Sequence, residues 1–179
     1  MKNCLIVVNT YKEESQELAG KIGKFLKSKK ISSSVFEFNG FSDVYPFSGY
    51  DFVITLGGDG TVLFASRGCA ELEIPVFPIN LGQFGFIAGI QKGEWKKSLT
   101  AFLDGKIPVV KRSLLTYSVK RGKKNILSGC CLNDIVISAR TAVHVIALDL
   151  ACNDISLGQC KADGIIVATS TGSTAYSAS

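Results

Sequence analysis

The sequence of 179 residues has few of the features that mark a metalloprotein, a secreted protein or a membrane protein. It has one histidine, His144, and none of its six cysteines forms a Cys-x-x-Cys pair, so no metal-ligand pattern is indicated. The cysteines are more typical of buried or inert thiols in a reducing cytoplasm than of a disulfide framework. The first apolar run, 5–8, is too short for a signal peptide, and no stretch is long enough to cross a bilayer. We therefore expect a cytoplasmic protein with no membrane partner, in which His144 has a structural or surface role.

The sequence also lacks a strong charge of one sign, because its net charge is only +5. Two short basic clusters, 27–30 and 121–124, carry part of it and are typical of a solvated helix end and a hairpin tip. Binding of single-stranded nucleic acid favours aromatic residues interleaved with the basic ones, and these clusters have none. We expect no nucleic-acid partner. Hydrophobic residues make up 46% of the chain, enough for the buried core of one large or two small globular domains.

The order of apolar runs predicts two domains. Residues 1–104 alternate strand patterns, at 4–9, 34–38, 51–56 and 75–80, with helical patterns at 13–28 and 61–71. This alternation predicts an α/β domain with a parallel, Rossmann-like sheet covered on both faces. Residues 105–179 predict an antiparallel β-rich domain, with strands at 113–120, 125–131, 132–138, 143–151 and 163–169.

A glycine-rich turn, Gly57-Gly58-Asp59-Gly60-Thr61, lies between the third predicted strand and a helix. Three glycines in four positions let a ligand approach the backbone without meeting Cβ atoms. Free N–H groups at the helix start favour a phosphate, so Gly57, Gly58 and Thr61 are candidate phosphate-binding residues. A carboxylate beside phosphates needs a metal ion between them or a hydroxyl from which to accept a proton, so Asp59 points to phosphoryl transfer. The alternative is a tight turn with Asp59 as the helix N-cap, and no Walker loop is present.

Three further segments carry candidate ligand contacts, each with a plainer alternative. Segment 80–86 has two glycines beside two phenylalanines. It could form a loop that brings an aromatic ring against a base or ribose, and the alternative is hydrophobic packing with two turns. The pair Asn133-Asp134 stands at the start of an apolar strand, although asparagine and aspartate are rare in strands. The two side chains could reach one ligand from a strand end or a bulge, and the alternative is a turn before the strand. Segment 163–176 surrounds an apolar strand with Asp163-Gly164 and a hydroxyl-rich run. Its hydroxyls and Tyr176 suit adenine and ribose, or the run is a polar loop.

In order and spacing, these four segments together resemble the NAD kinase family. The resemblance spans essentially the whole chain, and 171–176, Thr-Gly-Ser-Thr-Ala-Tyr, is its most specific part. The Gly-Gly-Asp-Gly turn is also found in diacylglycerol-type lipid kinases and phosphofructokinases. The resemblance implies transfer of a phosphoryl group from ATP or polyphosphate to the adenosine ribose 2′-hydroxyl of NAD, giving NADP. It also implies a divalent metal ion, Mg²⁺ or similar, as cofactor.

The resemblance implies a role for each candidate residue of the adenosine half. Asp59 would be the general base or orienting carboxylate for the 2′-hydroxyl, with Gly60 beside it, and Phe86 would line the adenosine pocket. Four residues would contact adenine or its ribose: Asn133, Thr174, Ala175 and Ser179. Replacing Asp59 with asparagine is then expected to abolish turnover and to leave NAD binding largely intact.

The resemblance also assigns the other half of the dinucleotide. Asp134 and Asp163 would hold the nicotinamide end, and Tyr176 would pack against the dinucleotide. Asp134 stands where the family commonly has glutamate, so its carboxylate is one methylene closer to the backbone and needs a closer strand to make the same contact.

The family pattern continues with further strands beyond the point where this sequence stops, at Ser179. We therefore expect an incomplete β-rich domain, and a 179-residue chain that by itself binds ligand poorly and has little activity. Robust conversion of NAD to NADP by this chain would refute that expectation.

Two other functions remain as alternatives. A lipid kinase of the diacylglycerol type would need an apolar acyl pocket, against which the 171–176 segment argues. A dinucleotide-binding subunit without turnover is an alternative of a different class. The leading hypothesis is an NAD kinase that takes the small molecules NAD and ATP as substrates, and we expect a homo-oligomer.

Overall fold

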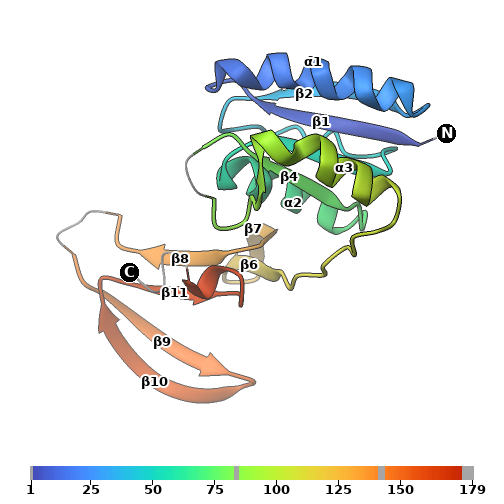
Figure 1. Ribbon diagram of the computed structural model, residues 1–179. Coiled ribbons are helices and arrows are strands. Elements are labelled where there is room, and N and C mark those ends of the chain that lie inside the picture. Colours follow the sequence, from blue (N-terminus) through green and yellow to red (C-terminus); the bar gives the residue numbers. More distant parts are fainter. Residues whose placement is uncertain (1, 83–84, 141–143, 175–179) are drawn as a thin grey trace. The chain divides into compact units, whose positions relative to one another are not determined.

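A computed structural model describes residues 2–82, 85–140 and 144–174, with the side chain of Thr174 left out (Figure 1). The chain divides into two compact units, Met1–Lys111 and Arg112–Ser179. Among the helices of the described ranges, none combines the length and apolar character that crossing a membrane requires.

The first unit is built on a parallel sheet of five strands in the order β2-β1-β3-β4-β5. The strands are β1 (Asn3–Asn9), β2 (Ser32–Phe38), β3 (Phe52–Gly57), β4 (Val76–Asn80) and β5 (Ile90–Gln91). All six residues of β3 are buried, because the strand is central and both faces of the sheet are covered. This is why its sequence is a continuous apolar run rather than an alternating one. The predicted parallel sheet is confirmed.

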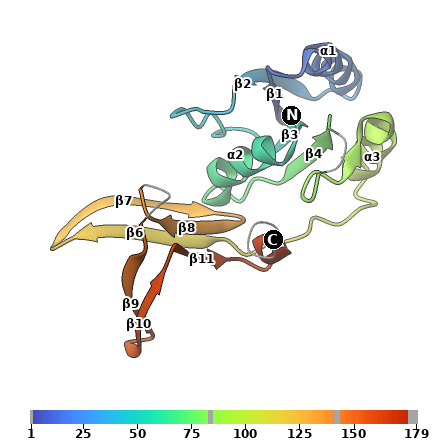
Figure 2. The same ribbon diagram turned by 90° about the vertical axis from the view of Figure 1, so that its left-hand side faces the viewer.

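Helices cover the two faces of this sheet (Figure 2). On one face, α1 (Glu13–Ser28) and α3 (Trp95–Leu103) pack against alternate strand residues such as Ile6 and Ile54. On the other face, α2 (Asp59–Ala70) packs against Val7 and Val53. A short 3₁₀ turn, η1 (Lys92–Glu94), leads into α3. The helical patterns at 13–28 and 61–71 correspond to α1 and α2, whereas α3 has no counterpart among the predicted elements.

The strand order places a reversal of connection between β1 and β3. From β1 the chain builds outward to β2, then crosses back to β3 and continues to β4 and β5. In open parallel sheets, ligands bind outside the carboxyl ends of the strands at such a reversal. Here those ends are Asn9 of β1 and Gly57 of β3.

The second unit consists of antiparallel pairs, as predicted. β6 (Leu115–Arg121) pairs with β7 (Lys124–Cys131), and β8 (Asp134–Ser138) pairs with β11 (Gly164–Ala168). A two-stranded ribbon is formed by β9 (Ile146–Cys152) and β10 (Ile155–Ala162), and η2 (Gly172–Thr174) follows β11. The basic cluster 121–124 lies at the β6–β7 hairpin tip, and the cluster 27–30 lies at the end of α1, both as predicted.

The strand β10 is a correction: the sequence predicts residues 152–154 only as a turn-rich spacer and predicts no strand between 151 and 163. Asn153 and Asp154 have φ angles of 49° and 64°, the left-handed conformation that a two-residue hairpin turn of type I′ requires. The spacer is therefore the turn of a hairpin. The residues of β10 are nearly all exposed, and a register shift between Ser156 and Gly158 interrupts the alternation that begins at Ile155, so no continuous strand pattern marks this segment.

Candidate functional site

The glycine turn has the strand-to-helix geometry that the sequence predicts. β3 ends at Gly57, Gly58 is the N-cap, and α2 begins at Asp59. A Cβ added at Gly57 would lie 2.3 Å from Thr61 Oγ1 and 3.1 Å from the Cβ of Asn9, so only glycine fits there without a shift. The Thr61 side chain is 1% exposed, and Asn9 Nδ2 donates to its hydroxyl at 3.4 Å. Thr61, predicted to bind phosphate, therefore turns its side chain into the protein.

Asp59 is the first residue of α2, and the N-cap position before it is held by Gly58. Its carboxylate instead accepts three backbone hydrogen bonds from the second glycine-rich segment. Phe86 N–H donates to Oδ2 at 2.9 Å, and the N–H groups of Ile87 and Ala88 both donate to Oδ1 at 3.1 Å. The structure thus joins the first two sequence motifs through one carboxylate, and the N-cap alternative for Asp59 is wrong.

The second segment approaches Asp59 closely because of Gly85. A Cβ at this position would lie 2.8 Å from Asp59 Oδ1 and 3.1 Å from the Cβ of Ala88. The next residue, Phe86, has 63% of its surface exposed, so its ring is free to contact a ligand. Gln83 and Phe84, in the middle of the segment, lie outside the described residues.

Two asparagines at strand ends belong to this part of the site: Asn80 opens the predicted segment 80–86, whereas Asn9 lies outside every ligand-contact segment predicted from the sequence. Asn9 ends β1 and Asn80 ends β4, each as the polar residue that closes an apolar run. Asn80 is 2% exposed, and its Oδ1 accepts a hydrogen bond from Gly82 N–H at 2.7 Å. Within the described ranges, its buried Nδ2 has no hydrogen-bond partner. The signal that finds both is a polar residue at the carboxyl end of a parallel strand.

In the second unit, Asn133 meets the hydroxyl-rich segment directly. Thr169 N–H donates to Asn133 O at 2.7 Å, and the Thr169 hydroxyl donates to Leu132 O at 2.5 Å. A Cβ at Gly172 would lie 2.2 Å from Asn133 O, so glycine is required for this contact. The Asn133 Oδ1 atom is buried and has no partner among the described residues. The third and fourth motifs are therefore adjacent.

The same hydroxyl-rich segment is held together by its own side chains. The N–H groups of Thr171 and Gly172 donate to Thr169 Oγ1 at 3.1 and 3.0 Å, which folds the chain into the turn before η2. Arg112 Nη1 donates to Thr171 Oγ1 at 3.1 Å. Thr169 and Thr171 are both buried, so their hydroxyls shape the segment rather than offer themselves to solvent.

Asp134 and Asp163, both expected at the nicotinamide end, are not brought together. Asp134 is the first residue of β8 and pairs with Ala168, the last residue of β11. Asp163 precedes the other end of β11, where its carbonyl oxygen accepts a hydrogen bond from Ala139 N–H at 3.3 Å. About five strand residues, on the order of 15 Å, separate the two aspartates. Thr174 lies in η2, and three predicted contacts fall outside the described residues: Ala175, Tyr176 and Ser179.

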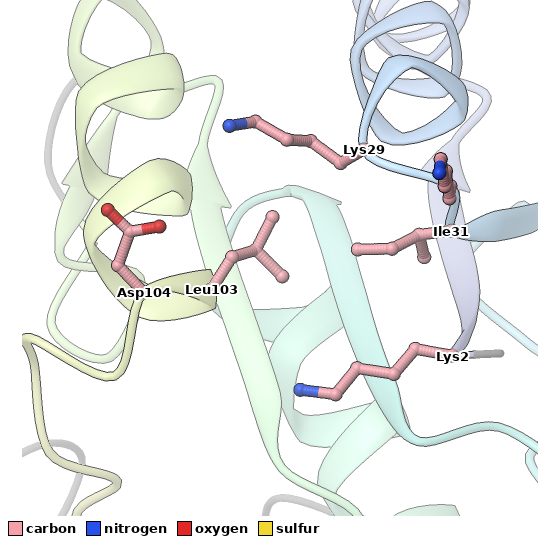
Figure 3. Close-up of a pocket in the computed structure, with 6 residues that line it drawn as sticks. Lys2, Lys29, Ile31, Leu103 and Asp104 are labelled. Atoms are coloured by element: carbon pink, nitrogen blue, oxygen red, sulfur yellow. The ribbon is translucent and has the colours of Figure 1, made fainter.

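Figure 3 shows a lysine-lined pocket. Lys2 and Ile31 of its lining precede the first residues of β1 and β2, so the pocket lies at the opposite end of the parallel sheet from Gly57, the last residue of β3. Its volume is about 280 Å³, and its lining consists of Lys2, Lys29, Lys30, Ile31, Leu103 and Asp104. Lys29 and Lys30 follow the last residue of α1, where cations interact favourably with the helix dipole. The helix dipole therefore accounts for lysines at this position without a ligand. None of the predicted site residues lines the pocket.

The remaining chemistry-bearing side chains include two buried cysteines and the single histidine of the sequence. Cys4 and Cys69 are buried, and burial raises the pKa of the Cys69 thiol to about 12 and that of Cys4 far above its ordinary range. Both are therefore inert thiols at neutral pH. His144 is exposed, in agreement with a surface role. In the described part of the chain, no three His, Cys, Asp or Glu side chains are grouped to hold a metal ion.

Known protein families match both units. A model of the ATP-NAD kinase N-terminal domain matches residues 42–107, and one of the ATP-NAD kinase C-terminal domain matches residues 132–179. The NAD kinase of Treponema denticola is 47% identical over 179 residues, which cover 99% of this chain and 63% of that protein. The NAD kinase of Treponema pallidum strain Nichols is 41% identical, over 97% of this chain and 57% of that protein. The chain thus spans less than two thirds of the length of these relatives.

Two solved structures share the fold. An NAD kinase from Archaeoglobus fulgidus in complex with ATP has a TM-score of 0.72 and 21% identity, with 99% of this chain and 64% of that chain covered. A yeast NADH kinase complexed with NADH has a TM-score of 0.85 and 22% identity, with coverages of 99% and 60%. With both units matched by domains of one family, and with relatives of that name at up to 47% identity, this chain belongs to the NAD kinase family.

Proposed function

We propose that the protein carrying this chain transfers a phosphoryl group from ATP to the adenosine ribose 2′-hydroxyl of NAD, giving NADP. The observation that carries the proposal is the Asp59 carboxylate at the start of α2, which accepts three hydrogen bonds from the backbone N–H groups of 86–88, including that of the exposed Phe86. A carboxylate beside a phosphate-binding helix start suits the activation of a hydroxyl. The relatives named NAD kinase, and the similar folds solved with ATP and with NADH, support this choice of substrates.

The proposed reaction has one proton transfer and one exchange of bonds at phosphorus. Asp59 accepts the proton of the 2′-hydroxyl as its oxygen forms a bond to the γ-phosphorus of ATP, and the bond from that phosphorus to the leaving ADP oxygen breaks. The backbone at Gly58 and Gly60 lies open to the phosphates, because a Cβ at either position would meet no atom within 4 Å, whereas the buried Gly57 shapes the turn from behind. The exposed ring of Phe86 packs against the adenosine.

The second unit is proposed to recognise the dinucleotide. Asn133 offers a buried Oδ1 without a partner among the described residues, which suits an amino group of adenine. Thr174, Ala175, Tyr176 and Ser179 keep the contacts that the family resemblance implies for them. Because the structure separates Asp134 from Asp163, we propose that these two carboxylates contact different parts of the nicotinamide half rather than one group.

The divalent metal ion enters this proposal as part of the ATP substrate. The described residues offer no cage of carboxylate, cysteine and histidine ligands. Mg²⁺ commonly keeps several waters and binds through substrate phosphates with one or two carboxylates, so a magnesium complex of ATP fits a site with few acidic residues. The ion neutralises phosphate charge when ATP binds, and no protein residue is assigned as its ligand. Polyphosphate is the alternative donor, to be compared with ATP in the same assay.

The test is to incubate the protein with Mg²⁺ and ATP and either NAD or diacylglycerol, and to quantify NADP and phosphatidate. The proposal predicts NADP that accumulates with time and is lost in the Asp59→Asn variant. Phosphatidate would instead identify a lipid kinase, and NAD binding without NADP would identify a non-catalytic dinucleotide-binding subunit. Full turnover in the Asp59→Asn variant would refute the role given to this carboxylate.

Location and assembly belong to the same proposal. We propose a cytoplasmic protein, supported by six cysteines that are all free thiols in the structure. We also propose a homo-oligomer, to be measured by size-exclusion chromatography with light scattering.

A further inference from the structure

The two oxygens of the Asp59 carboxylate are used unequally. Oδ1 accepts hydrogen bonds from the N–H groups of Ile87 and Ala88, whereas Oδ2 accepts one, from Phe86. An ionised carboxylate has about four lone-pair positions, two on each oxygen. Both positions on Oδ1 are therefore taken by the backbone, and one position on Oδ2 is left.

The three donors are consecutive residues that follow β4, more than 25 positions along the chain from Asp59. Phe86 is 63% exposed, so packing of its own ring does not fix its position. Its backbone is fixed instead by the bond to Oδ2 and by the bonds of its two neighbours to Oδ1. Without the carboxylate, these N–H groups lose their partner, and the segment loses the contact that orients Phe86.

We infer that Asp59 has two tasks, divided between its oxygens. Oδ1 holds the segment 86–88, and Oδ2 presents its remaining lone pair to the substrate hydroxyl. Gly85 is then a positioning residue, because a Cβ there would lie 2.8 Å from the same Oδ1 atom and force the segment away. The holding task is a property of the ligand-free protein, whereas the assignment of Oδ2 to the hydroxyl rests on the proposed function.

The inference changes the expectation for Asp59→Asn. With the amide oxygen in the place of Oδ1, the variant keeps two hydrogen bonds but turns its NH₂ group toward the N–H of Phe86, donor against donor. With the amide reversed, it loses both bonds of Oδ1. Either orientation disturbs the segment that carries Phe86. We therefore expect weaker NAD binding as well as lost turnover, in place of the intact binding expected from sequence alone.

The holding task is tested by hydrogen exchange of the ligand-free protein. Asp51→Asn is the matched control, because Asp51 Oδ2 also accepts a backbone hydrogen bond, from Asn3 N–H at 2.6 Å. In the Asp59→Asn variant we expect exchange at 86–88 to become faster by about tenfold or more, the effect of ~1.4 kcal/mol. In the control, 86–88 should exchange at the wild-type rate. Wild-type exchange at 86–88 in Asp59→Asn would overturn the inference.

The positioning role of Gly85 is tested with the carboxylate left in place. Gly85→Ala is compared with Gly89→Ala, whose added Cβ would meet no atom within 4 Å. We expect Gly85→Ala to raise the KM for NAD by about tenfold, a binding loss of ~1.4 kcal/mol, with a smaller change in kcat. Gly89→Ala should resemble wild type in both constants. Equal KM values in the two variants would contradict the role of Gly85.

The two experiments separate this inference from the proposed function. If the wild-type protein forms no NADP, the proposed function fails, but the exchange comparison still decides whether Asp59 holds 86–88. If NADP forms and exchange at 86–88 does not respond to Asp59→Asn, the proposed function stands and the inference fails.

Discussion

Replacing Gly57 with alanine places a methyl group where β3 meets the first turn of α2. The added Cβ would lie 2.3 Å from Thr61 Oγ1, 3.0 Å from Thr61 Cβ and 3.1 Å from Asn9 Cβ. Carbon and oxygen atoms in contact are normally more than 3 Å apart, and Thr61 is 1% exposed, so it has no free space to move into. The start of α2 must therefore shift away from the sheet.

The cost follows from overpacking. Extra methyl groups in well-packed regions typically destabilise by about 1–3 kcal/mol, partly offset by the ~0.4–1 kcal/mol that alanine gains by restricting the unfolded chain. We expect Gly57→Ala to lower the free energy of unfolding of the first unit by about 1–2 kcal/mol. Gly60→Ala is the control: its Cβ would meet no atom within 4 Å, and it lies within α2. It should stabilise by up to about 1 kcal/mol through helix propensity.

Urea unfolding followed by tryptophan fluorescence measures both changes. Trp95 is the only tryptophan, and it packs edge-on against Phe25 at 5.6 Å in the first unit, so its signal reports that unit alone. With an m-value of about 1–3 kcal/mol/M, the Gly57→Ala midpoint should fall by roughly 0.3–2 M. Adding Thr61→Ala should recover part of the loss, because the closest atom is removed. Equal midpoints for Gly57→Ala and Gly60→Ala would refute the reasoning.

Three other outcomes follow from the contacts. Gly172→Ala should speed hydrogen exchange at Thr169 N–H, because the new Cβ would lie 2.2 Å from Asn133 O, the atom to which this N–H donates. Unchanged exchange at Thr169 would contradict this packing. In the folded protein, iodoacetamide at pH 8 should label the exposed Cys152 but not the buried Cys69, which should react only after unfolding. Equal labelling of the two cysteines in the folded protein would show that burial does not protect Cys69. The pKa of Cys69 is raised from 9.0 to about 12, so its contribution to the free energy of unfolding is complete below about pH 9. That contribution decreases as the pH rises toward 12. In urea unfolding at a series of pH values, the free energy of unfolding of Cys69→Ala should therefore fall less steeply with pH than that of the wild type. Equal slopes for the two proteins would argue against the raised pKa.

The parallel half of the fold was open to prediction from sequence because burial leaves a direct trace. A strand covered on both faces, such as β1 or β3, is a continuous apolar run, and α1 repeats its apolar residues at helical spacing. α3 was also within reach, since Trp95, Leu99 and Phe102 follow the same spacing. β10 was not, because a strand exposed along nearly its whole length has no apolar residues selected by a core.

For the site, the sequence indicated residue types but not partners. Asp59 stood out as a carboxylate in a glycine turn, yet its partners are the backbone N–H groups of 86–88. Every residue except proline carries an N–H group, so no side-chain pattern marks these donors. The separation of Asp134 from Asp163 depends on the register of β8 against β11, which spacing along the chain does not reveal. The roles of these residues toward NAD stay predictions.

The hydrogen bonds between Asp59 and 86–88 join residues fewer than 30 positions apart, and all of them lie in the first unit. During synthesis, chains grow from the N-terminus at about 5–20 residues per second, and N-terminal domains fold first. The carboxylate can therefore find its three donors while the second unit is still being translated. The unit assigned to phosphate chemistry would then form these hydrogen bonds before the unit assigned to recognising the dinucleotide has been made.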